Sequence, residues 1–235
     1  MTAQIPLALR WPRRQRFDAF HAGANAAALA AVRALATASD APWVYLHGPP
    51  GSGRSHLLVA ACQAAAAAGR RAQYLPLAVL AERAAAIRGM AGADLLALDD
   101  LDALGGDVAA EHALFDAYNR SRAEGGGLLV AADVAPAALG LALPDLRSRL
   151  GACTRFALKP LLAAERRAVL KEQAALRGIV LDEPVLDWLF AHHARDLGTL
   201  LDLLDRLDRA SLAAQRRVTI PFLRELLHDD TAARC

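Results

Sequence analysis

The segment "HGPPGSGRSHLL" constrains the fold more than any other part of the chain. It follows the pattern G-x-x-x-x-G-K-[ST] of phosphate-binding loops, with Gly48, Gly53 and Ser55 in their places. Arg54 stands in the position that lysine usually holds. The apolar run "WVYLH" precedes the loop and the helix-forming run "RSHLLVAACQAAAAA" follows it. This order of strand, loop and helix lets backbone N–H groups and a helix dipole bind a diphosphate.

The loop and the first turn of the following helix supply the candidate nucleotide ligands. These are Gly48, Pro49, Pro50, Gly51, Ser52, Gly53, Arg54, Ser55 and His56. Arginine keeps the positive charge and bonds phosphate oxygens well, but it is longer than lysine, so we expect binding to survive more readily than fast hydrolysis. Ser55 is expected to ligate Mg²⁺ through its hydroxyl. The alternative is a glycine-rich turn that holds no ligand.

Short apolar runs alternate with longer helical segments in the first two thirds of the chain. We expect strands at residues 43–47, 72–77, 94–100, 128–133 and 154–158. This alternation predicts an α/β protein with a five-stranded parallel sheet covered by helices on both faces. The nearly continuous apolar runs "DLLAL" and "LLVAA" are typical of strands that are buried on both sides.

The strand pattern stops after Pro160, and only helical patterns follow. We expect helices within residues 161–178, 182–194, 199–215 and 219–228. Thr219 is the expected cap of the last helix. The predicted organisation is therefore an extended tail (1–16), a base domain (17–160) and a small α-helical domain (161–235).

Two of the predicted strands end in acidic residues. Asp99 and Asp100 end the run "LLALDD", and Asp133 ends "LLVAAD". Ligands of open α/β sheets bind at the carboxyl ends of strands, so we expect Asp99 to hold Mg²⁺ or its water. Asp100 would orient or deprotonate an attacking water, and Asp133 would contact that water or a terminal phosphate. The alternatives are that the Asp99–Asp100 pair caps a helix and that Asp133 forms a turn.

Composition excludes several classes of protein. The hydrophobic share of 55% is largely alanine in helix-forming runs, and no apolar run is long enough to span a membrane. The amino terminus has no signal-peptide pattern, so we expect a soluble, cytoplasmic protein. A net charge of +2 is too small to indicate direct nucleic-acid binding. Cys62, Cys153 and Cys235 are odd in number, widely spaced and without a CxxC motif, so neither a disulfide framework nor a zinc site is indicated.

The motifs "GPPGSGRS", "LLALDDLDAL", "LLVAADVAP", "LPDLRSRLG" and "ALKPL" occur in this order, and the chain thereby resembles the AAA+ ATPases. Within that family it is similar to the bacterial replication initiator DnaA and its regulatory relatives, over nearly its whole length. The resemblance implies an AAA+ αβα base domain followed by a small helical lid. It also implies a bound nucleotide, ADP or ATP, together with Mg²⁺.

The peptide "QIPLAL" near the amino terminus is similar to the short motif by which many replication proteins bind the sliding clamp of DNA polymerase III. Gln4 would make the polar contact of such a motif. Leu7 and Leu9 would fill an apolar pocket, with Ile5 assisting. The prolines of this tail disfavour a competing helix. The alternative is a disordered terminus with incidental leucines.

In "PDLRSRLG", Arg149 matches the arginine finger of the family, which reaches the nucleotide of a neighbouring subunit. A guanidinium supplied in trans accelerates phosphoryl transfer by about 10³ to 10⁵ in well-studied cases. Arg147 could instead form an ion pair across the interface. The resemblance thus implies a protein that binds ADP, docks on the DNA-loaded clamp and stimulates hydrolysis of ATP bound to DnaA. DNA would be reached indirectly, through the clamp, and a homodimer is compatible with the same resemblance.

One position departs from the family pattern. The lid helix that normally opens with a nucleotide-sensing arginine has Gly198 there, and Arg195 lies about one turn earlier. Either Arg195 substitutes as a nucleotide ligand, or coupling between the lid and the phosphates is lost. Two other functions remain open: a self-sufficient ATPase, such as a helicase loader or DNA remodeller, and a clamp-tethered scaffold with a vestigial pocket.

Overall fold

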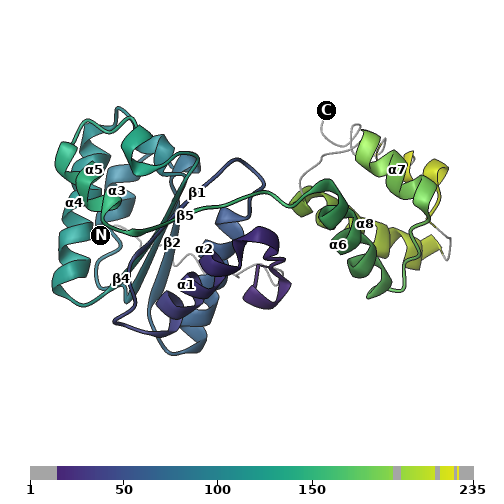
Figure 1. Ribbon diagram of the computed structural model, residues 1–235, viewed down its shortest axis with the longest axis horizontal. Helices are drawn as coiled ribbons and strands as arrows, with labels where there is room; N and C mark the ends of the chain where they lie inside the picture. The colour runs from purple at the N-terminus through teal and green to yellow at the C-terminus, as the bar shows by residue number, and fades with distance from the viewer. Residues whose placement is uncertain (1–14, 193–196, 215–217, 225–226, 228–235) are drawn as a thin grey trace, which may run out of the picture. The chain divides into compact units, whose positions relative to one another are not determined.

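The computed structural model describes residues 15–192, 197–214, 218–224 and 227. The chain divides into two compact units, Met1–Pro160 and Leu161–Cys235, and each has its own hydrophobic core. The first unit contains a sheet and helices, whereas the described part of the second is helical (Figure 1).

A five-stranded parallel sheet forms the centre of the first unit. Its strands are β1 (Val44–His47), β2 (Ala72–Pro76), β3 (Leu95–Asp99), β4 (Gly127–Ala132) and β5 (Thr154–Ala157). They lie in the order β2-β3-β4-β1-β5, and every neighbouring pair is parallel. All five predicted strands are present, and their ends differ from the prediction by at most one residue. The predicted fold class is confirmed.

The three central strands are buried, as their composition predicts. Every residue of β3 and β4 is buried, and β1 is buried except at His47. The edge strands β2 and β5 are more exposed. Because β3, β4 and β1 are neighbours in a parallel sheet, the residues that follow them lie close together at the carboxyl ends of the strands.

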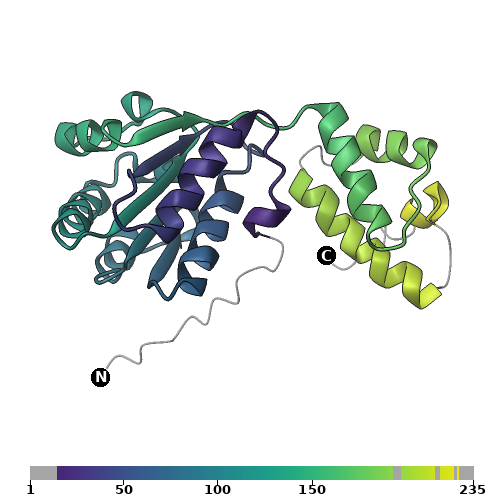
Figure 2. The ribbon, with the colours of Figure 1, turned by 60° about the horizontal axis from the view of Figure 1, so that its bottom comes forward.

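Helices cover both faces of this sheet (Figures 1 and 2). Two of them, α1 (Ala26–Thr37) and α2 (Arg54–Ala67), lie on one face. The other face carries α3 (Arg83–Arg88), α4 (Val108–Ala123) and α5 (Pro144–Gly151). The short helix α3 was not predicted, because six residues are too few to show a helical period.

The second unit consists of α6 (Ala163–Ala175), α7 (Glu183–His192), α8 (Leu197–Ala214) and a helical segment at 220–224. Their shared core is built mainly from leucines, among them Leu170, Leu186, Leu189, Leu200, Leu203, Leu204, Leu207 and Leu223. The expected cap is confirmed, since the Thr219 hydroxyl accepts a hydrogen bond from the Phe222 N–H at 3.4 Å. Within the described ranges, every helix is too short or too polar to cross a bilayer.

Asn25 ties the start of α1 to the segment after β5. Its Nδ2 donates to the Lys159 carbonyl at 2.8 Å, and its Oδ1 accepts from the Lys159 N–H at 2.9 Å. Asn25 is only 5% exposed, so water cannot readily replace these bonds. The bridge therefore fixes the end of the first unit against its beginning.

We expect Asn25→Ala to lower the free energy of unfolding by about 1–3 kcal/mol, because both backbone groups of Lys159 lose their partner. Urea unfolding followed by circular dichroism measures this change. The control Thr37→Ala removes a hydroxyl that donates to carbonyls of its own helix. Its effect should stay within about 0.5 kcal/mol, and equal effects of the two variants would contradict a special role for the bridge.

Candidate functional site

The phosphate loop, residues 48–53, joins β1 to α2. A Cβ at Gly48 would lie 2.4 Å from the Leu158 carbonyl oxygen. At Gly53, whose φ is +94°, a Cβ would lie 2.6 Å from the Phe20 ring. Glycine is therefore required at both positions, for space and at Gly53 also for conformation. Because α2 begins directly after the loop, the positive end of its dipole lies at the loop.

Two buried polar atoms at the loop have no hydrogen-bond partner in the described structure. They are the Ser52 hydroxyl oxygen and the Nη1 atom of Arg54. Buried polar groups are nearly always paired, so two unpaired donors at one phosphate loop indicate a ligand that accepts hydrogen bonds. Phosphate oxygens have this property, and the residues present thus fit a nucleotide.

Arg54 is also paired with the carboxylate that follows β4. Its Nη2 atom forms an ion pair with Oδ1 of Asp133. The Arg54 side chain is 10% exposed and that of Asp133 is 52% exposed, so the pair lies at the mouth of the site. Asp102 fixes the position of Asp133, because its Oδ2 accepts a hydrogen bond from the Asp133 backbone N–H at 2.6 Å. The structure thus places Asp133 beside the phosphate loop.

Asp99 and Asp100 lie at the carboxyl end of β3. Asp99 is 1% exposed, and its Oδ2 accepts a hydrogen bond from the Tyr74 hydroxyl at 2.8 Å. Asp100 has a φ of +56°, a conformation that no other non-glycine residue adopts in the described part of the chain. It occupies the N-cap position of a short 3-10 helix, Leu101–Leu104, but its side chain makes no capping bond. Helix capping therefore does not explain this aspartate.

Negative charge accumulates at this edge of the sheet. Burial and the neighbouring Asp99 raise the pKa of Asp100, and Arg54 opposes that rise. A raised carboxyl pKa is the direction that a general base requires. Burial, followed by the charge of Asp99, also raises the pKa of Tyr74, which keeps its hydroxyl protonated as a donor.

Ser55 and Asp99 are the residues that would hold Mg²⁺. Ser55 is exposed in the first turn of α2, and Asp99 lies at the end of β3. In the described part of the chain, no three His, Cys, Asp or Glu side chains are grouped as a metal site. Mg²⁺ commonly takes one or two protein ligands and completes its shell with phosphate oxygens and water. The donor set therefore fits a magnesium ion that arrives with a nucleotide.

The segment before α1 is anchored on α2. His56 Nε2 lies 2.8 Å from the Arg16 carbonyl oxygen, and the imidazole packs edge-on against Phe20 at 5.3 Å. Gln63 donates to the Gln15 carbonyl at 2.8 Å. The imidazole of His56, predicted as a nucleotide ligand, thus contacts this segment, and its burial lowers the pKa.

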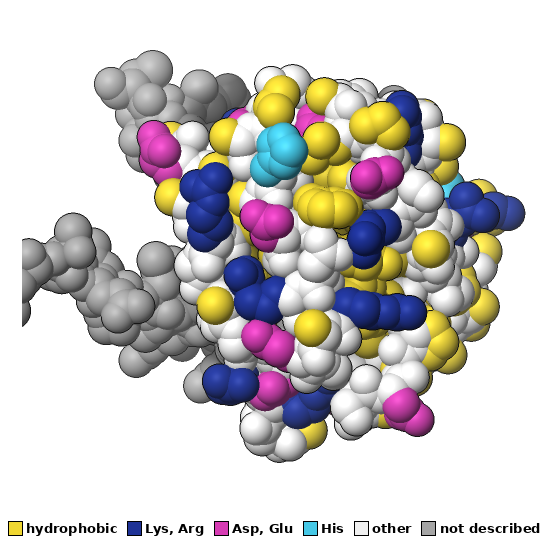
Figure 3. Space-filling model, turned by 90° about the vertical axis from the view of Figure 1, so that its left-hand side faces the viewer, with side chains coloured by type: hydrophobic (Ala, Val, Ile, Leu, Met, Phe, Trp, Pro, Cys, Tyr) yellow, Lys and Arg dark blue, Asp and Glu magenta, His cyan; other side chains and the backbone are white. Residues whose placement is uncertain are grey.

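Arg149 lies on α5, and its guanidinium stacks on α4. The guanidinium carbon is 4.8 Å from the ring centre of Phe115 and 5.3 Å from that of Tyr118. Nη1 of Arg149 donates a hydrogen bond to Oδ1 of Asn119. Arg149 is partly exposed. The side of the first unit that carries α4 and α5 shows basic side chains among apolar ones (Figure 3). The contacts of this cation are therefore with α4.

Three residues at or near the site were not predicted: Tyr74, Asp102 and Glu111. Asp102 follows the predicted acidic pair closely, and its proximity to that pair was an available signal. Glu111 on α4 is fully buried and accepts hydrogen bonds from the N–H groups of Ala142 and Leu143, at 3.0 and 2.8 Å. These two bonds fix the start of α5, but no sequence pattern marks such an acid.

Several predicted residues lie outside the described residues. They are the clamp-binding candidates Gln4, Ile5, Leu7 and Leu9, and the possible nucleotide sensor Arg195. Gly198 is exposed in the first turn of α8. The hypotheses for these positions stay predictions.

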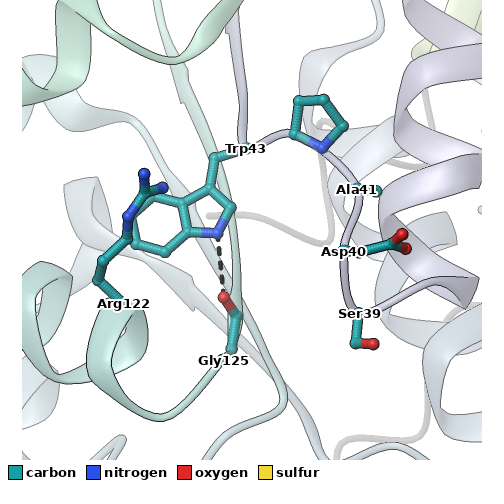
Figure 4. Close-up of a pocket in the computed structure, with 8 residues that line it drawn as sticks. Ser39, Asp40, Ala41, Trp43, Arg122 and Gly125 are labelled. Atoms are coloured by element: carbon teal, nitrogen blue, oxygen red, sulfur yellow. Dashed lines mark hydrogen bonds between the residues drawn. The ribbon is translucent and has the colours of Figure 1, made fainter.

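A hollow of about 260 Å³ lies at the opposite edge of the sheet (Figure 4). There Trp43 donates its indole N–H to the Gly126 carbonyl at 3.0 Å, and the Arg122 guanidinium lies 5.2 Å from the indole ring. Because Trp43 precedes β1 and Gly126 precedes β4, the hollow is remote from the phosphate loop. We assign it no part in nucleotide binding.

Solved structures share the fold of this chain. AMPPCP-bound DnaA from Aquifex aeolicus matches with a TM-score of 0.71 at 23% identity, covering 84% of this chain and 66% of that one. Domain III of DnaA from Thermotoga maritima matches with a TM-score of 0.73 at 21% identity, covering 93% and 98%. A variant of RuvB from Thermotoga maritima gives 0.62 at 19%, covering 91% and 71%. The chain thus spans slightly less than two thirds of the Aquifex protein.

Two family models match the chain itself. The model of the bacterial DnaA ATPase domain matches residues 12–156, which is more than half of the chain. The model of the Hda lid domain matches residues 163–227. The chain therefore belongs to the bacterial DnaA ATPase domain family of AAA+ proteins, and its second unit is a lid of the Hda type.

Proposed function

We propose that this protein is a regulator of replication initiation that binds ADP with Mg²⁺ and stimulates hydrolysis of ATP held by DnaA. In this proposal the amino-terminal tail docks the protein on the DNA-loaded sliding clamp. The observation that carries the proposal is the placement of two arginines. Arg54 lies at the chain's own phosphate loop. Arg149 lies on α5, where its guanidinium packs against α4 and the residue stays partly exposed.

Nucleotide binding is supported by the two unpaired donors at the phosphate loop, Ser52 and Arg54. It is also supported by relatives of the same fold, since the Aquifex DnaA and another replication initiator DnaA are bound to AMPPCP. A bound nucleotide would bring its phosphates and Mg²⁺ to the site. The backbone N–H groups of the loop would orient the phosphates.

We expect Ser55→Ala to weaken ADP binding about tenfold in the presence of Mg²⁺, because one hydroxyl ligand of the ion is lost. In EDTA the variant and the wild type should bind ADP equally. Isothermal titration calorimetry measures both conditions, and Ser39→Ala, at the opposite edge of the sheet, is the control. An equal loss with and without Mg²⁺ would contradict a metal-ligand role for Ser55.

The proposed stimulation of ATP hydrolysis on DnaA requires that the Arg149 guanidinium is already oriented when it reaches the phosphates of that ATP. Stacking on Phe115 and Tyr118 and the bond to Asn119 restrict the rotamers of Arg149. A cation that is already oriented stabilises transition-state charge without reorganisation. Glu111 supports this arrangement, since it fixes the backbone that leads into α5. Arg149 would therefore be presented to a phosphate of another molecule.

We expect Arg149→Ala to reduce stimulation of DnaA-bound ATP hydrolysis by about 10³ or more, the size of arginine-finger effects. The assay combines DnaA loaded with radiolabelled ATP, DNA-loaded clamp and the variant, and ADP binding is measured in parallel. Arg147→Ala is the matched control and should retain most of the stimulation. Normal stimulation by Arg149→Ala would refute the trans-arginine mechanism, and loss of ADP binding would indicate misfolding.

A triple variant with alanine at Gln4, Leu7 and Leu9 tests the tail. We expect it to lose binding to the sliding clamp in surface plasmon resonance, because the apolar anchors supply most of the affinity of such a peptide. ADP binding should be unchanged. A variant with alanine at both Arg13 and Arg14 is the control for charge. Unaltered clamp binding by the triple variant would show that the tail is not the docking element.

A second candidate function is a self-sufficient ATPase. The observation that favours it is Asp100, which lies beside Asp99 and Arg54 with a raised pKa. That function requires substantial ATP turnover by the isolated chain, whereas a trans-acting regulator shows turnover only with DnaA and the DNA-loaded clamp. A scaffold with a vestigial pocket would bind no nucleotide at all.

A further inference from the structure

We propose that Glu111 is a positioning residue for Arg149. Its buried carboxylate sets where α5 lies on α4, and thereby the direction in which the Arg149 guanidinium is presented. The consequence for stimulation of DnaA-bound ATP hydrolysis rests on the proposed function. The dependence of Arg149 on Glu111 is measurable without DnaA.

The start of α5 has no capping side chain of its own. Its N-cap residue is Leu143, which makes no side-chain capping bond, and Leu146 stands at the third helical position. In a capping box that position holds a Glu or Gln, which accepts the N–H of the N-cap residue. Glu111 supplies this acceptor from α4, because its Oε2 accepts the Leu143 N–H at 2.8 Å. Its Oε1 accepts the Ala142 N–H at 3.0 Å, so one side chain holds two consecutive backbone groups.

The burial of Glu111 indicates that these bonds control geometry rather than packing alone. The residue is fully buried, and within the described ranges no cation pairs with it. A buried carboxylate is costly unless it is well hydrogen-bonded, and an apolar side chain of similar volume often serves stability equally well. Charge-assisted bonds to backbone N–H groups are short and directional. Placing the backbone that enters α5 is therefore the role that this carboxylate explains.

The contacts between α4 and α5 occur at two levels. Glu111, Phe115 and Tyr118 are spaced by four and three residues, so they lie on one face of α4. Arg149 stacks on both rings of this face. Six residues separate Leu143 from Arg149, about 9 Å of helix, and seven separate Glu111 from Tyr118, about 10 Å. The two contacts thus match in spacing along both helices, and together they fix the rotation and register of α5.

The apolar contacts of α5 do not fix its register by themselves. Leu146 and Leu150 are fully buried and would keep the helix packed without Glu111. Burial of apolar side chains is non-directional, however, so it tolerates a small rotation or slide. Loss of the carboxylate should therefore displace Arg149 without unfolding the protein. A misplacement of about 1 Å can lower a rate about 10²-fold.

The first measurement records the arginine side-chain signals of the full chain in a proton–nitrogen correlation NMR spectrum. The Nε–H signal of Arg149, identified by its absence in Arg149→Lys, should be shifted upfield by the two aromatic rings. It should move toward the signals of exposed arginines in Glu111→Ala and in Glu111→Gln. The glutamine variant keeps the shape of the side chain but replaces one acceptor oxygen with a donor. A signal that stays in place in both variants would overturn the inference.

The second measurement is the rate of DnaA-bound ATP hydrolysis at increasing concentrations of the protein. Glu111→Ala should lower the saturating rate about 10²-fold, and Glu111→Gln should lower it less. The concentration for half-maximal stimulation should stay within about threefold, because an interaction made in the transition state changes the rate and not the binding. Asn25→Ala is the matched control. It also removes a buried side chain that bonds two backbone groups, but on another segment, and it should retain the wild-type rate.

Urea unfolding of the same variants separates positioning from stability. Equal losses of rate in Asn25→Ala and Glu111→Gln would overturn the inference, because general destabilisation would then explain both. An unchanged rate in both Glu111 variants would also overturn it. A wild type that does not stimulate DnaA would overturn the proposed function, and the Arg149 signal alone would then decide whether Glu111 positions this arginine.

Discussion

The adjacency of three parallel strands is the constraint on which the site depends. Because β3, β4 and β1 are neighbours, the acids that follow β3 and β4 lie beside the phosphate loop that follows β1. Residues far apart in the sequence, such as Arg54 and Asp133, thereby form an ion pair. The buried apolar strands keep these ends in register, since each strand is held by neighbours on both sides. The chemistry of the site is thus a consequence of strand order.

Within this frame, the replacement of lysine by arginine changes what the loop can do. A rigid, planar cation can pair with Asp133 and still offer a second nitrogen to a ligand. In the proposed function, such a loop would hold a nucleotide rather than hydrolyse it rapidly. Arg149 is stacked on aromatic rings of α4, and in the proposed function it is the cation that would act on a different molecule. The proposal therefore gives two roles to separate arginines: Arg54 would bind this chain's own nucleotide, and Arg149 would act on a nucleotide bound to another molecule.

The sequence predicted the features that local patterns encode. Strand positions followed from apolar runs, and the phosphate loop followed from glycine spacing in a strand, loop and helix context. The sequence could not predict contacts that depend on three-dimensional placement. Examples are the Arg54–Asp133 ion pair, the bond from Tyr74 to Asp99, and the buried Glu111 that fixes the start of α5. Each joins residues on different elements, and residue type at one position does not reveal its partner at another.

The account's central claim is that the arginine-bearing loop holds a nucleotide while Arg54 remains paired with Asp133. A crystal structure of the ADP complex tests it most directly. The account predicts phosphate oxygens within hydrogen-bond distance of Ser52 Oγ and Arg54 Nη1, with the ion pair to Asp133 intact. A nucleotide bound elsewhere, or an Arg54 side chain that leaves Asp133 and points away from the phosphates, would contradict it.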